Sequence, residues 1–361
     1  MANNKLDAAQ IQAALDAKII TAEQAQEMRA DLDAPAQNTP AHNTSAVTNS
    51  NNAAIGHEDN MRFLRSFSDV FIAIGLVLMT LGLSGVTNIM GGEVLFLGAA
   101  MVMWLGAEFF GRKKRAHLPT LILALGFLIF VQRGFAALLD GGGSLAALVT
   151  LGAMAVFYWR IRLPFCIALI AASALFLLFT LLDQYVPGLT KKNLGPVIGL
   201  AGLAVFGAAL AYDVNDEHRT TRFADNAFWL HFLAAPLIIH GIAITGVSLK
   251  SEKIFGLSLP SLGTGDAIFV LIIFALLTFA GLAINRRALI VSALGYAGFA
   301  ITSLFIGAGM GLGTSLLVAL LVLGGAIVFL GVGWHGARDI LLKILPKWRI
   351  FPPPFDPNYK S

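Results

Sequence analysis

Four polar side chains inside long apolar stretches are the first candidates for chemistry in this sequence. Gln132 and Arg133 are neighbours in one stretch, and His231 and His240 lie in another, with Pro236 between them. Charged and hydrogen-bonding groups are rare at membrane depth because hydrocarbon cannot solvate them, and they usually face a bundle interior or a cavity. We therefore take Gln132, Arg133, His231 and His240 as candidate substrate-binding residues.

Arg133 admits two interpretations. Its guanidinium presents a rigid fork of donors that suits an anion, which would make it part of a site for an anionic solute. Alternatively, its long side chain extends toward the membrane surface and Asp140, which lies seven residues further on and therefore on the same helix face. The sequence leaves both interpretations open.

The two histidines are nine residues apart, so at about 100° per residue they lie on opposite faces of a straight helix. We therefore do not expect them to share a metal site. Each is either hydrogen-bonded to a neighbouring helix or takes part in a proton relay or a substrate contact. His240 and Arg133 are expected in the same half of the membrane, and they would line one cavity if their two helices pack together.

Acidic residues stand mainly near the ends of the apolar stretches. Glu93, Asp225 and Asp266 lie at expected helix starts, where a carboxylate can cap free amides and complement the helix dipole. Glu108 precedes Arg112 by four residues, which predicts an ion pair on one helix face.

Two patterns resemble binding motifs without the context that those motifs need. The loop 212–225 contains Asp213, Asp216, Glu217 and His218. Their spacing matches no cation-binding loop, so we expect this loop to be charged and solvated. The letters G-x-G-x-x-G at 331–336 follow an apolar stretch instead of a strand, which argues against dinucleotide binding.

Because no H-E-x-x-H, nucleophile elbow or pair of buried carboxylates occurs, we predict no catalytic residues, no cofactor, no metal site and no enzymatic activity.

The elements that must position these residues are membrane-spanning helices. Hydrophobic residues make up 57% of the chain and charged ones 13%, and the mean hydropathy is +0.76, which excludes a soluble core. Ten apolar stretches of about 18 to 23 residues can each cross a hydrocarbon layer of ~30 Å, so the predicted fold class is an all-α integral membrane bundle. The spacing of Gly195 and Gly199, and of Gly295 and Gly298, predicts close helix contacts, while the single Cys166 predicts packing and no disulfide. The expected spans are 68–90, 92–110, 118–139, 143–159, 163–182, 194–212, 226–245, 265–284, 288–308 and 314–334.

Basic residues predict the orientation of this bundle. Ten spans place both termini on one side, and the connections and flanking segments of that side carry 17 lysines and arginines against four on the other side. The positive-inside rule therefore predicts cytoplasmic termini. No signal peptide precedes the first span, and the expected location is the inner membrane. A net charge of +4 then reflects the membrane surface, and no nucleic-acid partner is expected, because the basic residues are spread through the loops.

Four regions are expected along the chain. Residues 1–33 form a cytoplasmic hairpin of two short helices, because each predicted helix begins with a capping-box pattern. The alternative is a marginally stable, solubilising tail, because so short a hairpin buries little surface. Residues 34–60 are rich in Ala, Asn, Thr, Ser and Pro and form a disordered linker. Residues 61–335 hold the ten spans, and residues 336–361 form an interfacial helix and a proline-rich cytoplasmic tail.

The stretches RFADNAFWLHFLAAPLIIH and NRRALIVSALGYAGFA, the second followed by a final glycine-rich span, resemble those of bacterial polytopic inner-membrane proteins of unknown function. The pattern AKIITAEQAQEM near the N-terminus resembles the short helical-hairpin modules that bacterial proteins attach to membrane domains. This resemblance implies a membrane bundle but no known reaction, so it supplies no site residues.

Two functions fit the sequence. A carrier or permease-like protein for a small solute, anionic if Arg133 binds it, is favoured, because ten helices with proline, glycine and a few intramembrane polar groups suit a central site. The alternative is a non-transporting membrane sensor or scaffold, whose hairpin at residues 5–33 recruits a cytoplasmic protein. A polar cavity that reaches Arg133 or His240 favours the carrier, and a dry bundle favours the scaffold.

Overall fold

In a computed structural model of the chain, the described residues are 67–345, apart from 141–142, 187, 217–220, 247–248 and 255–256, together with Gln12 and Asp16. Gln12 and Asp16 are helical, and Gln12 Nε2 donates a hydrogen bond of 3.0 Å to Asp16 Oδ1. Apart from these two residues, the predicted hairpin and the linker lie outside the described residues, as does the tail beyond residue 345.

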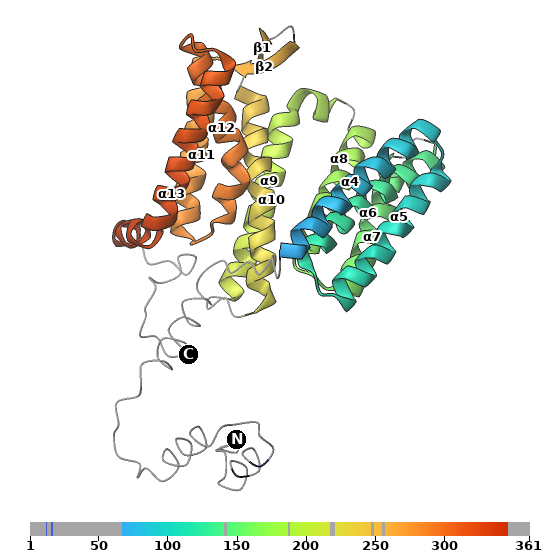
Figure 1. Ribbon diagram of the computed structural model, residues 1–361. Helices are drawn as coiled ribbons and strands as arrows, with labels where there is room; N and C mark the ends of the chain where they lie inside the picture. The colour runs from blue at the N-terminus through green and yellow to red at the C-terminus, as the bar shows by residue number, and fades with distance from the viewer. Residues whose placement is uncertain are drawn as a thin grey trace. The chain divides into compact units, whose positions relative to one another are not determined.

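Ten helices in the described region are long and apolar enough to cross a membrane (Figure 1). The prediction of an all-α membrane bundle is therefore confirmed, and each predicted span corresponds to one helix. In chain order the helices are α4 (Phe67–Met90), α5 (Glu93–Ala107) with the π-helical turn η1 (Glu108–Lys113), α6 (His117–Leu138), α7 (Gly143–Ile161), α8 (Phe165–Tyr185), α9 (Leu189–Asn215), α10 (Arg222–Gly246), α11 (Thr264–Ala283), α12 (Ala288–Gly307) and α13 (Leu312–Ile344).

A short β-hairpin joins α10 to α11, where the sequence analysis placed only a connection. Its strands, β1 (Leu249–Ile254) and β2 (Leu257–Leu262), are antiparallel. The buried amide of Leu262 donates a hydrogen bond of 3.2 Å to Ser303 Oγ, which ties the end of the hairpin to α12.

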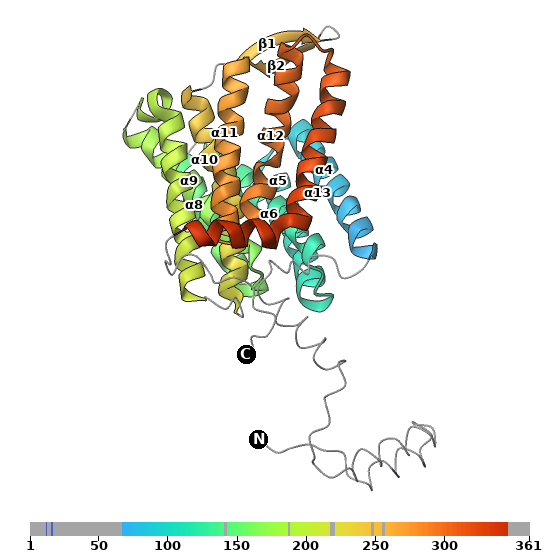
Figure 2. The same ribbon diagram turned by 90° about the vertical axis from the view of Figure 1, so that its left-hand side faces the viewer.

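The last helix continues beyond the predicted end of its span at residue 334. Instead of separate spanning and interfacial helices, α13 is one helix of 33 residues, and its C-terminal part runs across the other helices (Figure 2). Trp334, Arg338 and Leu341 are buried on this part, while Ile344 is exposed. The helix ends before Pro346, because proline disfavours helical geometry in the residue that precedes it.

The first five helices share one apolar core. In it, α5 packs on α6, α6 on α4 and α7, and α7 on α8. Trp104, Phe127 and Phe157 form its aromatic centre, with ring centroids 5.2 to 5.5 Å apart. Cys166 is fully buried in the same cluster, so its predicted packing role is confirmed. Helix α8 also contacts α9 and α10 and so connects this core to the remaining helices.

The most extensive helix contact in the described region is between α9 and α10, and glycine makes it possible. A Cβ atom at Gly241 would lie 2.3 Å from the backbone nitrogen of Gly199, and one at Gly195 would lie 2.7 Å from the carbonyl oxygen of Gly241. The predicted close contact at Gly195 and Gly199 is thus confirmed. The prediction for Gly295 and Gly298 is wrong, because no atom lies within 4 Å of a Cβ at Gly295 and only a Leu323 methyl, 3.5 Å away, approaches one at Gly298.

Candidate functional site

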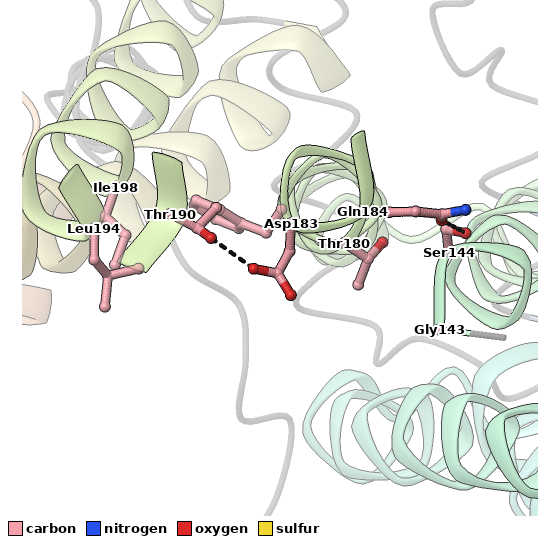
Figure 3. Close-up of a pocket in the computed structure, with 9 residues that line it drawn as sticks. Gly143, Ser144, Thr180, Asp183, Gln184, Thr190, Leu194 and Ile198 are labelled. Atoms are coloured by element: carbon pink, nitrogen blue, oxygen red, sulfur yellow. Dashed lines mark hydrogen bonds between the residues drawn. The ribbon is translucent and has the colours of Figure 1, made fainter. Parts of the chain in front are cut away.

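A cleft of about 570 Å³ lies between the N-terminal ends of α7 and α9 and the C-terminal end of α8 (Figure 3). We call it the α7–α9 cleft. Phe179, Leu194 and Ile198 supply its apolar lining. Its polar lining consists of Ser144 from α7, Thr180, Asp183 and Gln184 from α8, and Thr190 from α9.

Hydrogen bonds arrange the polar side chains of the cleft. Thr190 Oγ1 donates to Asp183 Oδ1 at 2.8 Å, which joins α9 to α8. Ser144 Oγ donates to Gln184 Oε1 at 2.6 Å, which joins α7 to α8. Thr180 Oγ1 donates to the Leu177 carbonyl of its own helix at 2.8 Å. The hydroxyl protons of the cleft are therefore all used within the protein.

The start of α9 brings Thr190 to Asp183. Gly188 has φ 88°, a left-handed conformation that glycine adopts without strain, and it lets the chain reverse direction after α8. Asn193 then departs from helical geometry, and Pro196 lacks the amide proton that would continue the hydrogen-bond ladder. A kink next to the cleft thus separates the first turn of α9 from the rest of the helix.

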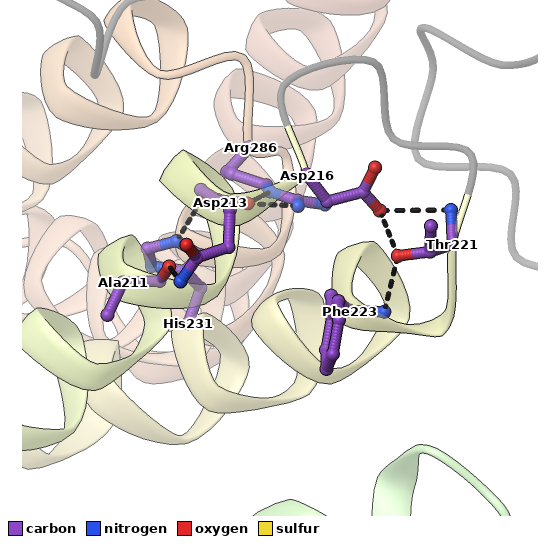
Figure 4. A network of polar contacts seen from close by, with 8 residues as sticks. Ala211, Asp213, Asp216, Thr221, Phe223, His231 and Arg286 are labelled. Carbon is purple, nitrogen blue, oxygen red and sulfur yellow. Dashed lines mark hydrogen bonds and ion pairs between the residues drawn. The ribbon is translucent and has the colours of Figure 1, made fainter.

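A buried ionic network lies at the opposite end of α9 (Figure 4). Asp213 Oδ2 accepts a hydrogen bond of 2.8 Å from His231 Nε2 of α10. Its other oxygen accepts a bond of 3.0 Å from Arg286 Nε, and Arg286 Nη2 contacts the same oxygen. The side chains of His231, Arg286 and Asp213 are 0%, 2% and 9% exposed. The network therefore ties α9, α10 and the turn between α11 and α12 together.

The prediction of a solvated loop is wrong for Asp213 and Asp216. Helix α9 continues to Asn215 instead of ending near residue 212, and this extra turn directs Asp213 toward His231. Asp216 is buried and accepts hydrogen bonds from Thr221 N at 3.0 Å and Thr221 Oγ1 at 2.6 Å, just before α10 begins (Figure 4). Glu217 and His218 lie outside the described residues.

The turn that carries Arg286 is itself anchored. Asn285 has φ 55°, which asparagine tolerates better than most residues, and its Oδ1 accepts a hydrogen bond of 2.8 Å from Trp334 Nε1. The Arg287 guanidinium lies 5.1 Å from the Trp334 ring centroid. The C-terminal part of α13 thus holds the turn from which Arg286 reaches Asp213.

Gln132 and Arg133 bind different neighbouring helices. Gln132 Oε1 accepts a hydrogen bond of 2.8 Å from Thr150 Oγ1 on α7, and Arg133 Nη1 donates one of 2.6 Å to Asn88 Oδ1 on α4. Within the described part of the chain, Arg133 forms no ion pair with Asp140. Of the two interpretations, the one in which Arg133 extends toward Asp140 does not match this contact with the neighbouring helix α4.

The two histidines also have different partners. The hydroxyl of Tyr296 on α12 lies 3.3 Å from His240 Nδ1, while His231 binds Asp213 on α9. Both contacts fit the interpretation in which each histidine is bonded to a neighbouring helix. The structure does not bring His240 and Arg133 together. Arg133 on α6 contacts Asn88 on α4, whereas His240 on α10 contacts Tyr296 on α12. The cleft includes none of the four predicted site residues.

The contacts of three other acidic residues, Glu93, Glu108 and Asp266, agree with the predictions only in part. Glu108 Oε1 accepts a hydrogen bond of 2.7 Å from Arg112 Nη1, which confirms the expected pair, and it also contacts Arg160 on α7. Glu93 and Asp266 do lie in the first turns of α5 and α11. This position fits the predicted interaction with the helix dipole. The predicted capping hydrogen bonds are absent, since glycine occupies both N-cap positions and neither helix has a side-chain cap hydrogen bond.

The cleft residues were missed because they lie at and beyond the end of a predicted span. Asp183 and Gln184 follow the span 163–182 directly, where polar side chains are ordinary. A usable signal was nevertheless present. Gly188 and Pro196 interrupt the apolar pattern just after these polar residues, and such interruptions mark solute sites in transporters.

Comparisons of the chain with known protein families, with curated proteins and with solved structures found no match. The functional assignment therefore depends on the geometry of the molecule.

Proposed function

We propose that this polytopic membrane protein is a carrier or permease-like protein that binds a small polar solute in the α7–α9 cleft. The cleft itself carries the proposal. Its volume of about 570 Å³ suits a small molecule, since most such sites measure roughly 300 to 1,000 Å³. It also combines apolar side chains with a few convergent polar groups, as small-molecule sites do.

Helix α9 supports a role in transport beyond binding. Its interrupted first turn lines the cleft, while Asp213 at its other end belongs to the buried ionic network. A solute that contacts α8 and α9 therefore touches a helix that reaches the opposite face of the bundle. Tight packing on α10 through Gly195, Gly199 and Gly241 makes these two helices a unit that can move together.

The charge distribution supports uptake from outside the cell. The cleft lies at the same end of α9 as Lys192, on the side with few basic residues, whereas Arg222 and Arg287 lie toward the opposite end. By the positive-inside rule, the cleft would open to the exterior of the cytoplasmic membrane and both termini would be cytoplasmic. The proposed solute site is therefore at α8 and α9 and not at Arg133 and His240, which the cleft does not include.

The test is thermal unfolding of the purified protein in detergent against a panel of amines, sugars, polyols and carboxylic acids. A ligand that binds the folded state raises its unfolding temperature by mass action. Solutes that stabilise the protein are then assayed for uptake into proteoliposomes. We expect at least one solute class both to stabilise the protein and to be taken up.

Variants inside and outside the cleft show whether stabilisation and uptake depend on it. Thr180→Trp and Ser144→Phe fill the cleft from two different walls, whereas Leu203→Trp places a bulky ring on the exposed face of α9. We expect stabilisation and uptake to be lost in the first two and kept in the third. If both cleft variants keep stabilisation and uptake, the carrier proposal is wrong. It is also wrong if the parent binds or transports no solute class, and an anchoring or scaffold function is then favoured.

A further inference from the structure

We propose that the solute of the α7–α9 cleft is a small organic cation with N–H donors, bound by the Asp183 carboxylate. This inference rests on the proposed function and specifies the class of its substrate. Three independent features of the cleft support it, namely its charge, its unused hydrogen-bonding groups and its apolar wall.

Asp183 is the ionisable side chain among the residues that line the cleft. It forms no ion pair with any residue that the structure describes, and the exposed Lys192 on the next helix is not part of the lining. Asp183 Oδ1 accepts the hydrogen bond from Thr190, and the second oxygen forms no hydrogen bond with the residues that the structure describes. The cleft therefore presents a carboxylate, fixed by one hydrogen bond, whose negative charge attracts a cation.

The unused hydrogen-bonding groups of the cleft are mostly acceptors. Ser144, Thr180 and Thr190 each donate their hydroxyl proton to another protein atom, so only oxygen lone pairs remain for a ligand. Gln184 accepts from Ser144 and retains its amide as a donor. A ligand with several N–H groups satisfies such a cleft, whereas a carboxylate or phosphate would face lone pairs and a negative charge.

A bare metal ion fits the cleft less well than an organic cation. Calcium takes about six to eight oxygen ligands, usually from more than one carboxylate. Among the described residues, no group of three or more His, Cys, Asp and Glu side chains is arranged to hold a metal. Phe179, Leu194 and Ile198 provide apolar surface that a hydrated ion would not use but a hydrocarbon body would cover.

Three probes of similar size and different charge test the inference. Ethanolamine carries an ammonium group, ethylene glycol is neutral and glycolate is an anion. Thermal unfolding of the full chain in detergent is followed against each probe, with sodium chloride at the same ionic strength as a further arm. We expect a concentration-dependent rise in unfolding temperature with ethanolamine and none with the other three.

Asp183→Asn tests the carboxylate directly. It keeps an oxygen for the Thr190 hydroxyl and removes the charge, so folding should be little affected. Loss of a charge-assisted hydrogen bond should weaken ethanolamine binding about tenfold or more. Asp140→Asn is the matched control, because Asp140 is exposed in the connection after α6 and outside the cleft lining.

The outcomes separate this inference from the proposed function. Equal ethanolamine binding by the parent and Asp183→Asn would overturn the cation inference. Stabilisation of the parent by glycolate or ethylene glycol, without stabilisation by ethanolamine, would also overturn it. If Thr180→Trp abolished that stabilisation, the carrier proposal would still stand. If neither these probes nor the wider panel binds the parent, both ideas fail together.

Discussion

Replacing Gly241 by alanine should weaken the contact between α9 and α10. The new Cβ would lie 2.3 Å from Gly199 N, 2.5 Å from Gly199 Cα and 2.8 Å from Gly195 O. All three are backbone atoms, so no side-chain rotation can relieve the overlap. Because ordinary contacts begin near 3.4 Å, the two helices must separate by about 1 Å.

This separation determines how far the free energy of unfolding should fall in Gly241→Ala. Overpacking a tight interface costs roughly 1 to 3 kcal/mol, and the better helix propensity of alanine returns up to about 1 kcal/mol. We therefore expect a net loss of up to about 2 kcal/mol in the free energy of unfolding. Equilibrium unfolding in mixed micelles, in which SDS is increased and helix content is followed by circular dichroism, measures this quantity.

Gly207→Ala is the matched control, because Gly207 lies on α9 and no atom lies within 4 Å of the position that its new Cβ would occupy. We expect this variant to be as stable as the parent or more stable by up to about 1 kcal/mol. If Gly241→Ala unfolds at the same SDS fraction as Gly207→Ala, the helices are not as close as the structure has them, and the reasoning is refuted.

Three further predictions concern the ion pairs and the orientation. Asp213→Asn should lower the free energy of unfolding by about 1.5 to 3 kcal/mol in the same assay, because it removes the charge of a carboxylate that accepts hydrogen bonds from His231 and Arg286; a loss below about 1 kcal/mol would contradict a buried network. Glu108→Gln should cost no more than about 1 kcal/mol, since the side chains of its partners Arg112 and Arg160 are 45% and 42% exposed, and a larger loss would show that these pairs are shielded from solvent. Reporter fusions should show a cytoplasmic position after Arg115 and an exterior one near Lys253, and inverted activity at either site would break the predicted topology.

Local features of the sequence were sufficient to predict the helices and some of their contacts. Hydropathy located all ten spans, because the length of an apolar stretch alone decides whether it can cross the hydrocarbon layer. The pair Glu108 and Arg112 and the close contact at Gly195 and Gly199 were also predicted, since four-residue spacing places side chains on one helix face. The end of α9 was not predicted, and that error of a few residues changed Asp213 from a loop residue to a helical one.

The amino-acid sequence by itself determined that the described region from residue 67 to 345 is a bundle of ten apolar helices, because that property depends only on neighbouring residues. Tertiary structure alone decided which polar groups meet. Asp213 binds Arg286, 73 residues away, and Ser144 binds Gln184, 40 residues away. The physical reason is that lipid and protein interior are equally apolar, so the hydropathy of a spanning helix does not indicate which of its faces turns toward a neighbour. Only the packing of the helices places the carboxylate of Asp183 in a cleft and that of Asp213 in a buried network.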